Sequence, residues 1–259
     1  MSRPHIAMSV LETASWPVQN MLPTFMRVLD EAERSRAARF VRPRDAHDYM
    51  VAHGACRMLL GQVLSVPPAL LRFTTAKAGA KPRLAWPAQA GVDFNISHTQ
   101  GLVMCAVASQ PDESVAMPDA AAQDTPEASR IPTLSVGVDC EDVRAEIDDA
   151  SLDTYCSEAE IRTLHRRPPS WRHVLWTLKE ALAKACGSGL SLDLRTLRIE
   201  MPQAGAPQVL AVAPDMGRAD EWHLHHWQPT ARHVATLAYR TPDGAPVQIE
   251  HINVLEAVA

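Results

Sequence analysis

The sequence predicts an α+β protein built as two lobes of similar size and plan. The first observation behind this prediction is the composition of residues 109–134, which hold four prolines and five acidic residues but no aromatic residue. Such a segment buries too little apolar surface to offset its ordering entropy, so we expect an acidic linker or a long surface insertion. The second observation is that residues 1–108 and 135–259 each show a helical pattern together with paired strand patterns.

In the first lobe, residues 31–64 have a helical pattern that Pro43 interrupts. Residues 94–99 and 102–108 are typical of two strands, and the short glycine-containing turn between them predicts a hairpin. A cluster of arginines gives this lobe its basic character: Arg34, Arg36, Arg39, Arg42 and Arg44.

In the second lobe, residues 135–141 have the pattern of a strand. Ser157 and Glu160 have the spacing of a capping box, which opens a helix. After two prolines, we expect Ser170 to cap a further helix and Gly187 to end it. A closing hairpin is predicted at residues 222–227 and 234–239.

The composition excludes several classes of protein. Of 259 residues, 46% are hydrophobic and 21% are charged, which is the composition of neither a disordered chain nor a membrane protein. The longest apolar stretch, residues 102–108, is much shorter than the roughly 20 residues that span a bilayer. The first ten residues lack the apolar core of a signal peptide, so we expect a cytoplasmic protein. Five cysteines without a C-x-x-C pair argue against a disulfide framework and a zinc site.

The net charge of −5 is distributed unevenly along the chain. Residues 1–108 hold 12 basic and 7 acidic residues, residues 109–134 hold 1 and 5, and residues 135–259 hold 12 and 18. This polarity suggests that the first lobe binds an anion and the second a cation, although chance would also account for it. Nucleic acid is a poor partner, because the basic stretch lacks interleaved stacking aromatic residues.

Asp139 and Glu141 point to a metal site. In a strand, side chains alternate between faces, so these two carboxylates share one face of residues 135–141 while Val136, Val138 and Cys140 face the core. Neighbouring carboxylates repel each other unless a cation lies between them, and ligands that are all oxygen suit Mg²⁺. The alternative is a strand that ends at the surface with two solvated acids.

A second candidate lies on the helix that Gly187 ends. Trp176, Glu180 and Lys184 follow one another at four-residue spacing, which places them on one helix face. The alternative is an ordinary surface pair of Glu and Lys. However, the chain has only four lysines against 21 arginines, and Lys81, Lys179 and Lys184 are three of the four. A retained lysine suggests a site that needs a compact point charge. The opposite face carries an apolar stripe: Leu175, Leu178, Leu182 and Ala185.

A third candidate is the strand end at Asn95, Ser97 and His98, where polar side chains could donate hydrogen bonds to a phosphate. The alternative is a structural histidine.

The three motifs in this order, Asn-Ile-Ser-His, Gly-Val-Asp-x-Glu and Trp-x-x-Lys-Glu-Ala-x-x-Lys-x-x-Gly-x-Gly-Leu, resemble the Sfp-type 4′-phosphopantetheinyl transferases. Residues 40–47 and the Ala80-Lys81-Pro82 segment also match the family, so the resemblance covers residues 34–239.

The resemblance implies a monomer of two similar lobes related by a pseudo-twofold axis, with coenzyme A in the cleft between them. The implied reaction moves the phosphopantetheine arm of coenzyme A to a serine of an apo carrier protein (acyl, peptidyl or polyketide type) and releases adenosine 3′,5′-bisphosphate. Mg²⁺, or in its place Mn²⁺, is the implied metal. The sequence does not distinguish between the three types of carrier.

The resemblance also implies roles for individual residues. Asp139, Glu141 and Glu180 would hold the metal, and Lys184 would contact the phosphate that is transferred. Glu180 would be the base for the carrier serine, directly or through a metal-bound water. The remaining coenzyme A contacts would be Arg44, Lys81 and Pro82 at the nucleotide and Ser97 and His98 at the 3′-phosphate, with Arg36 nearby. The sequence departs from the family pattern at two positions: Ala80 stands where a glycine is usual, and Asp48 stands where some members carry a basic residue.

Two other functions would use some of the same residues. Another Mg²⁺-dependent phosphate-transferring enzyme would be expected to carry a glycine-rich phosphate loop, and G-x-x-x-x-G-K-[ST] is absent. A member that only binds coenzyme A or a carrier would be expected to have lost its catalytic residues. The predicted set is complete: Asp139, Glu141, Glu180 and Lys184.

Overall fold

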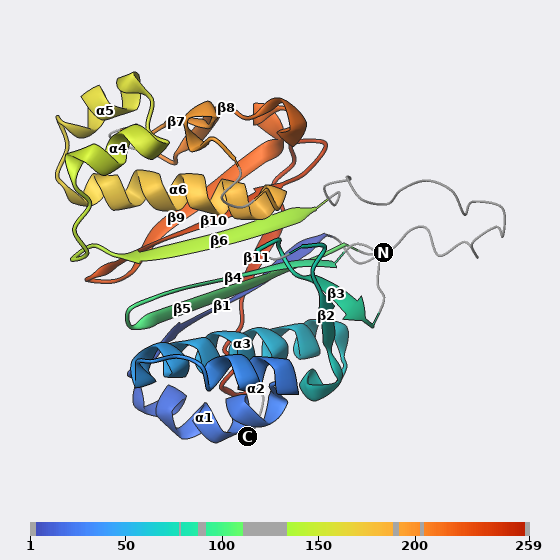
Figure 1. Ribbon diagram of the computed structural model, residues 1–259. Helices are drawn as coiled ribbons and strands as arrows, with labels where there is room; N and C mark the ends of the chain where they lie inside the picture. Colours follow the sequence, from blue (N-terminus) through green and yellow to red (C-terminus); the bar gives the residue numbers. More distant parts are fainter. Residues whose placement is uncertain are drawn as a thin grey trace, which may run out of the picture.

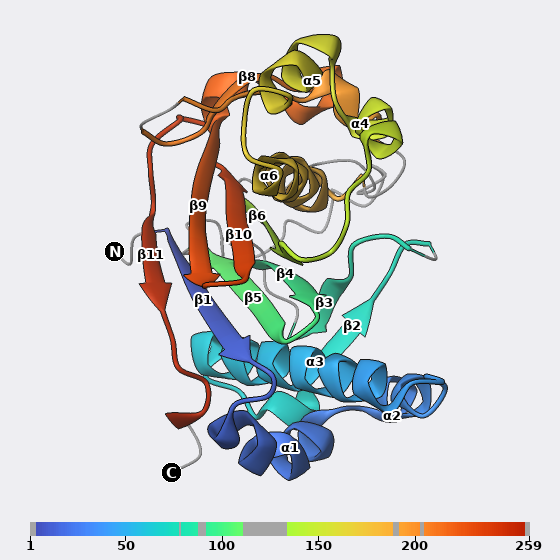
Figure 2. The same cartoon turned by 90° about the vertical axis from the view of Figure 1, so that its left-hand side faces the viewer.

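Two β-sheets face each other in the centre of the protein, and helices cover the outer side of each (Figures 1 and 2). The architecture comes from a computed structural model. It describes residues 4–77, 79–87, 92–110, 134–188, 192–202 and 205–256. The predicted mixed α+β class is confirmed, whereas the pseudo-twofold relation and the monomeric state stay predictions.

The first sheet has the strand order β11-β1-β5-β4. Its strands are β11 (Gln248–His251), β1 (His5–Glu12), β5 (Leu102–Ser109) and β4 (Val92–Thr99). Strand β5 is antiparallel to β1 and β4, while β11 pairs with β1 in parallel. The helices of this half are α1 (Trp16–Val28), α2 (Glu31–Ala37) and α3 (Pro43–Leu64). A small hairpin follows α3, formed by β2 (Arg72–Thr74) and β3 (Arg83–Trp86).

The second sheet has the order β6-β10-β9 and is antiparallel throughout. Its strands are β6 (Ser135–Asp142), β10 (His233–Arg240) and β9 (Trp222–Thr230). Its helices are α4 (Asp149–Tyr155), α5 (Glu158–Leu164) and α6 (Ser170–Cys186), and a second small hairpin joins β7 (Arg198–Glu200) to β8 (Gln208–Ala211).

Three apolar cores hold these layers together. The core between the sheets contains Ile6, Met104, Val136, Val138 and Cys140, all of which are almost fully buried. The three residues from β6 are those that the alternation of its sequence predicts to face inward. The other two cores lie between α3 and the first sheet and between α6 and the second, and the stripe Leu175, Leu178, Leu182 and Ala185 belongs to the latter. The side of β6 that faces α6 therefore remains for Asp139 and Glu141.

Several local predictions are confirmed and one is wrong. Pro43 is the first residue of α3, the capping box of Ser157 and Glu160 is formed, and Gly187 ends α6 in the left-handed conformation. Ser170 does not cap α6, because the first helical turn already begins before it and the Arg172 amide donates to the Pro169 carbonyl. A residue inside the first turn has helical dihedral angles, so its side chain is not at the N-cap.

Residues 248–254 lie with the first sheet, although the sequence groups residues 135–259 as one lobe. Strand β11 pairs with β1 through the register Ile6 to Ile249, and Val254 is fully buried in the core beneath α3. The predicted linker lies almost entirely outside the described residues. In the described part of the chain, none of the helices is long and apolar enough to cross a membrane, and all five cysteines are free.

His226 on β9 makes the stability of the protein depend on pH. Burial lowers the pKa of its imidazole to about 4, whereas the unfolded chain keeps a value near 6.5. The unfolded state therefore binds more protons between these values, and the free energy of unfolding falls as the pH falls through this window. Since the ring is only partly covered, we expect a loss of about 1–2 kcal/mol between pH 7 and pH 5.

Urea unfolding of wild type and His226→Gln across that range measures the effect. The glutamine variant is expected to show a flatter pH dependence, and His165→Gln, at an exposed position on the surface, serves as the matched control. An unchanged pH slope in His226→Gln would contradict the prediction.

Candidate functional site

Gly137 allows α6 to pack directly on β6. A Cβ at this position would lie 3.0 Å from Cα of Ala185, and closer still to the main-chain oxygen of Ala181 and the nitrogen of Ala185. No side chain fits there without moving the helix. Because Gly137, Asp139 and Glu141 share a strand face, this close approach brings the two carboxylates against Glu180 and Lys184 on α6.

Asp139 and Lys184 form the centre of the site. The Lys184 ammonium lies 2.6 Å from Oδ1 of Asp139 and 3.1 Å from the Ser97 hydroxyl, which itself donates to Oδ1 at 2.9 Å. Asp139 is only 4% exposed, whereas the Lys184 side chain is 27% exposed. Burial lowers the pKa of Lys184, but the carboxylate beside it outweighs this effect and raises the pKa. The ammonium is therefore charged at neutral pH.

Glu141 and Glu180 lie next to this pair and carry perturbed carboxyl groups. Burial, together with the charge of Asp139, raises the pKa of Glu141 to about 7. Its oxygens accept hydrogen bonds from the Trp176 indole at 3.1 Å and the Thr99 hydroxyl at 3.4 Å. The same two causes raise the pKa of Glu180, in the same order of size. Asp139 contacts Lys184 directly, and the positive charge of Lys184 also lowers the pKa of both Glu141 and Glu180, against the stronger effect of burial.

The donor set suits a hard divalent cation. Oδ2 of Asp139 is buried without a hydrogen-bond partner, and a buried carboxylate oxygen in that state is strongly disfavoured unless a cation or donor meets it. All the neighbouring candidate ligands are oxygen atoms, as Mg²⁺ requires. Within the described ranges, no three His, Cys, Asp or Glu side chains already surround a single point. The residues therefore fit a magnesium ion by their chemistry and by the unpaired Asp139 oxygen.

A polar stripe on β4 joins the two sheets. Asp93 and Asn95 accept hydrogen bonds from the main-chain amides of Val136 and Val138, at 2.8 and 2.9 Å. Further along β4, Ser97 reaches Asp139 and Thr99 reaches Glu141. These four side chains occupy alternate positions of one strand, so they share the face toward β6. Asp93 and Asn95 thereby supply two main-chain amides at the edge of β6 with the acceptors that a neighbouring strand would otherwise provide.

Asp93 is the residue that the sequence reasoning missed. It accepts hydrogen bonds from Lys81 as well as from Val136, and Lys81 also donates to the Val136 carbonyl at 2.7 Å. The signal was available, because polar residues at every second position of an otherwise apolar strand indicate a buried polar contact. Lys81 and the adjacent Pro82 lie at this junction, and their contact with a nucleotide stays a prediction.

Ser97 and His98 point to opposite sides of β4. His98 is exposed and lines a hollow of about 540 Å³ together with Thr99, Gln100, the loop that precedes α3 and three residues of α3 itself, Arg44, Asp45 and Asp48. Ser97 is buried on the other side and belongs to the Asp139 group. The structure thus brings Arg44 and His98 together in one pocket, and Ser97, Asp139 and Lys184 in another cluster, with Thr99 between them.

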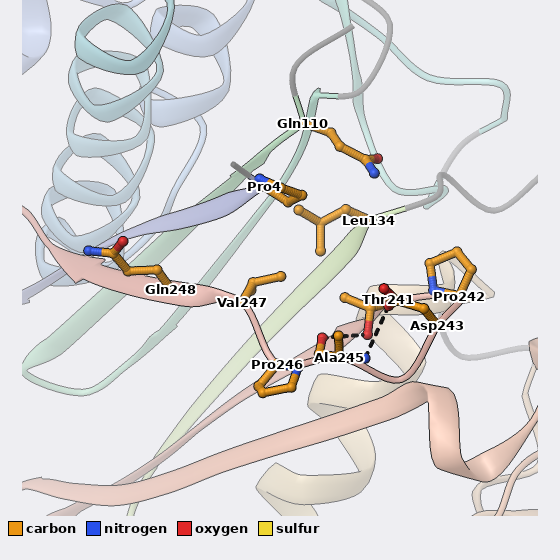
Figure 3. Close-up of a pocket in the computed structure, with 10 residues that line it drawn as sticks. All are labelled: Pro4, Gln110, Leu134, Thr241, Pro242, Asp243, Ala245, Pro246, Val247 and Gln248. Atoms are coloured by element: carbon orange, nitrogen blue, oxygen red, sulfur yellow. Dashed lines mark hydrogen bonds between the residues drawn. The ribbon is translucent and has the colours of Figure 1, made fainter. Parts of the chain in front are cut away.

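Another hollow lies away from these residues. Figure 3 shows it at the ends of β1, β5 and β6, lined by side chains such as Leu134, Val247 and Thr241. The Thr241 hydroxyl is already bonded to the Ala245 carbonyl at 2.9 Å. None of the predicted site residues lines this hollow.

Lys179 has a structural role, although its rarity had suggested a site. Its side chain is completely buried, and the ammonium donates to Oε2 of Glu160 at 2.8 Å and to the carbonyls of Tyr155 and Leu194. All three N–H donors of the ammonium therefore have acceptors.

Because removal of Lys179 leaves the charge of the buried Glu160 carboxylate unpaired, we expect Lys179→Ala to lower the free energy of unfolding by about 3–5 kcal/mol. Urea unfolding measures this loss, and Lys77→Ala, at an exposed position, should be neutral. Equal stability of both variants would contradict the assignment.

Two family models match the chain. Residues 135–238 match the 4′-phosphopantetheinyl transferase superfamily, and residues 14–111 match the 4′-phosphopantetheinyl transferase N-terminal family. The first match spans β6, α6 and β10, and the second spans the α1–α3 region and the β4–β5 hairpin.

Individual relatives agree with these models. The 4′-phosphopantetheinyl transferase HetI of Nostoc sp. is 28% identical over 226 residues, covering 85% of this chain and 82% of that protein. The 4′-phosphopantetheinyl transferase Sfp of Bacillus subtilis is 26% identical over 195 residues, or 74% of each chain. A mouse L-aminoadipate-semialdehyde dehydrogenase-phosphopantetheinyl transferase is 24% identical over 236 residues, covering 85% of this chain and 70% of the relative. Because models of this family match both halves of the chain, the chain belongs to the 4′-phosphopantetheinyl transferase superfamily.

Proposed function

We propose that this protein transfers the 4′-phosphopantetheine group of coenzyme A to a serine hydroxyl of an apo carrier protein in the cytoplasm. The observation that carries the proposal is the group of Asp139, Glu141, Glu180 and Lys184, packed together by Gly137 beside the pocket of Arg44 and His98. Such a group supplies negative oxygen ligands, a fixed cation and a carboxylate base within one region, which are the requirements of phosphoryl transfer.

The carboxylates have separate roles in this proposal. Asp139, Glu141 and Glu180 would hold Mg²⁺, which when bound neutralises charge on the pyrophosphate of coenzyme A. Its neighbours fix Asp139 for this role, because Lys184 and Ser97 both bind Oδ1 and leave Oδ2 free. Trp176 and Thr99 orient Glu141 in the same way.

Lys184 and Glu180 would act on the reacting atoms. As the serine oxygen forms its bond to the phosphorus next to pantetheine, the bond to the leaving phosphate breaks and adenosine 3′,5′-bisphosphate departs. The Lys184 ammonium would stabilise the negative charge on the transferred phosphate. Glu180 would take the serine proton. Arg44 and His98 would bind the nucleotide phosphates in their pocket, with Lys81, Pro82 and Ser97 as further contacts.

Incubation with coenzyme A, Mg²⁺ and a panel of apo acyl, peptidyl and polyketide carriers, followed by intact-mass measurement, tests this proposal. We expect at least one carrier to gain the mass of one phosphopantetheine group. A Lys184→Met variant should give no gain at the same enzyme concentration. The absence of any gain with the wild-type protein, while coenzyme A still binds, would instead support a protein that only binds it.

A further inference from the structure

The β4–β5 turn is held by the β9–β10 turn of the other sheet. The main-chain oxygen of Gln100 accepts hydrogen bonds from Nη2 of Arg232 at 2.9 Å and from Nε2 of His233 at 3.0 Å. Gly101, which follows with φ of 95°, lies against the same two side chains. Two hairpins that are more than 130 residues apart in the sequence are thereby joined at one carbonyl oxygen.

Both donors are themselves fixed in place. His233 is only 2% exposed, and its Nδ1 lies 2.7 Å from the Thr230 hydroxyl. Because a carbonyl oxygen only accepts hydrogen bonds, Nε2 carries the proton, and the Thr230 hydroxyl donates to Nδ1. Arg232 forms an ion pair with the buried Asp142, which Arg144 also binds. Residues of the second sheet thus hold the side chains of both Arg232 and His233 in the positions from which they donate to Gln100.

The other side of the same turn meets the Arg44 pocket. The guanidinium of Arg44 has only donors, so we assign the Gln100 amide the orientation in which its oxygen faces Arg44 and accepts from Nη2 at 3.2 Å and from Nη1. Arg44 and Gln100 both line the pocket, whereas Arg232 and His233 do not. One residue before Gln100, Thr99 reaches Glu141. The turn therefore lies between the arginine of the pocket and the carboxylates of the second sheet.

We propose that Arg232 and His233 are positioning residues that hold Gln100 so that its side chain orients Arg44 toward the phosphates of coenzyme A. This inference rests on the proposed function, and it concerns affinity for coenzyme A rather than the chemical step. Without hydrogen bonds to the Gln100 carbonyl, the turn can move and the Arg44 side chain becomes less ordered. Binding of coenzyme A then costs more conformational entropy, because Arg44 must be ordered at that point.

The test measures the Kd of coenzyme A by calorimetry and, separately, kcat and the KM for each substrate. For Arg232→Ala we expect a roughly 5- to 10-fold weaker Kd, the effect of losing about one charge-assisted hydrogen bond, with kcat and the carrier KM within 2-fold of wild type. His233→Leu should weaken binding similarly. His233→Gln retains an N–H donor near the place of Nε2, so it should restore most of the affinity.

Two comparisons separate positioning from general destabilisation. Arg218→Ala removes an arginine from an exposed pair with Asp220 and should leave the Kd unchanged. In an Arg44→Ala background, Arg232→Ala should change the Kd by less than 2-fold, because residues that act through one another are not additive. Additive effects, or an Arg232→Ala variant that loses only thermal stability, would overturn the proposal.

The proposed function and this inference fail in different ways. A wild-type protein that binds coenzyme A but modifies no carrier refutes the transfer reaction, and the Kd series then still decides the role of Arg232 and His233. Normal transfer together with an unchanged Kd in both single variants refutes the positioning role alone. A wild-type protein that does not bind coenzyme A refutes both.

Discussion

Asp139→Ala is expected to reduce phosphopantetheine transfer by about 10²–10³-fold or more, because it removes several kcal/mol of charge stabilisation in the transition state. The carboxylate has two roles in the site: Oδ1 pairs with Lys184, and the unpaired Oδ2 is the proposed metal ligand. The variant takes away both. Single-turnover measurement at saturating coenzyme A gives the rate of the chemical step, and comparison at several Mg²⁺ concentrations shows whether excess metal restores it.

The variant should remain folded, although Asp139 is buried. Lys184 is partly exposed, so water can replace its lost partner, and we expect a cost of about 1–3 kcal/mol in the free energy of unfolding. Asp139→Asn keeps the shape and isolates the charge, and Glu180→Ala should abolish transfer as well. Asp220→Ala, in an exposed pair with Arg218, is the matched control. Wild-type rates in Asp139→Ala or Glu180→Ala would refute the metal assignment.

Gly137→Ala is expected to damage both stability and activity, since its Cβ would meet the main chain of α6 rather than a movable side chain. To make room, α6 must move away from β6 and disturb the core around Leu178 and Leu182. Overpacking of this kind costs about 1–3 kcal/mol. The same movement separates Glu180 and Lys184 from Asp139, and a displacement of about 1 Å in a catalytic group reduces rates by roughly 10²-fold.

Gly54→Ala provides the comparison for this variant. Its Cβ would lie 2.8 Å from Cα of Phe25, between α3 and α1 and far in the sequence from the carboxylates. Both variants should unfold at lower urea concentration than wild type, but only Gly137→Ala should lose kcat per folded molecule. If Gly137→Ala retains wild-type kcat, close packing of α6 on β6 is not what places the site.

The parts of the site that could be predicted from the sequence are those that a single element determines. Period two on β6 put Asp139 and Glu141 on one face, and four-residue spacing on α6 put Trp176, Glu180 and Lys184 on another. Which faces meet is a different question, because it depends on contacts between residues more than 40 positions apart, such as Ser97 and Asp139. The resemblance to a family supplied that information, since local patterns do not contain it.

Other features were missed because their local signals were weak or ambiguous. Strand β1 and helix α1 precede the first strong helical pattern, and α1 contains Pro23, which argues against a helix when read locally. Because lysine is rare in this chain, the sequence marks Lys179 and Lys184 equally as candidate site residues. In the structure, Lys179 is buried with three partners, whereas Lys184 lies in the site. Burial decides between these roles, and burial depends on how α5 and its capping box pack against α6.

Because β11, near the end of the sequence, pairs with β1, the protein cannot be divided simply into two independent halves. A fragment that stops near residue 110 would contain α1–α3, the β2–β3 hairpin and three of the four strands of the first sheet, but β1 would keep an unpaired edge that invites association with other chains. It would also have a void beneath α3, where Val254 belongs. Separately produced halves should therefore combine only when the second carries residues 248–256. The catalytic unit can thus be split into two fragments, and the presence or absence of this terminal strand decides whether they reassociate.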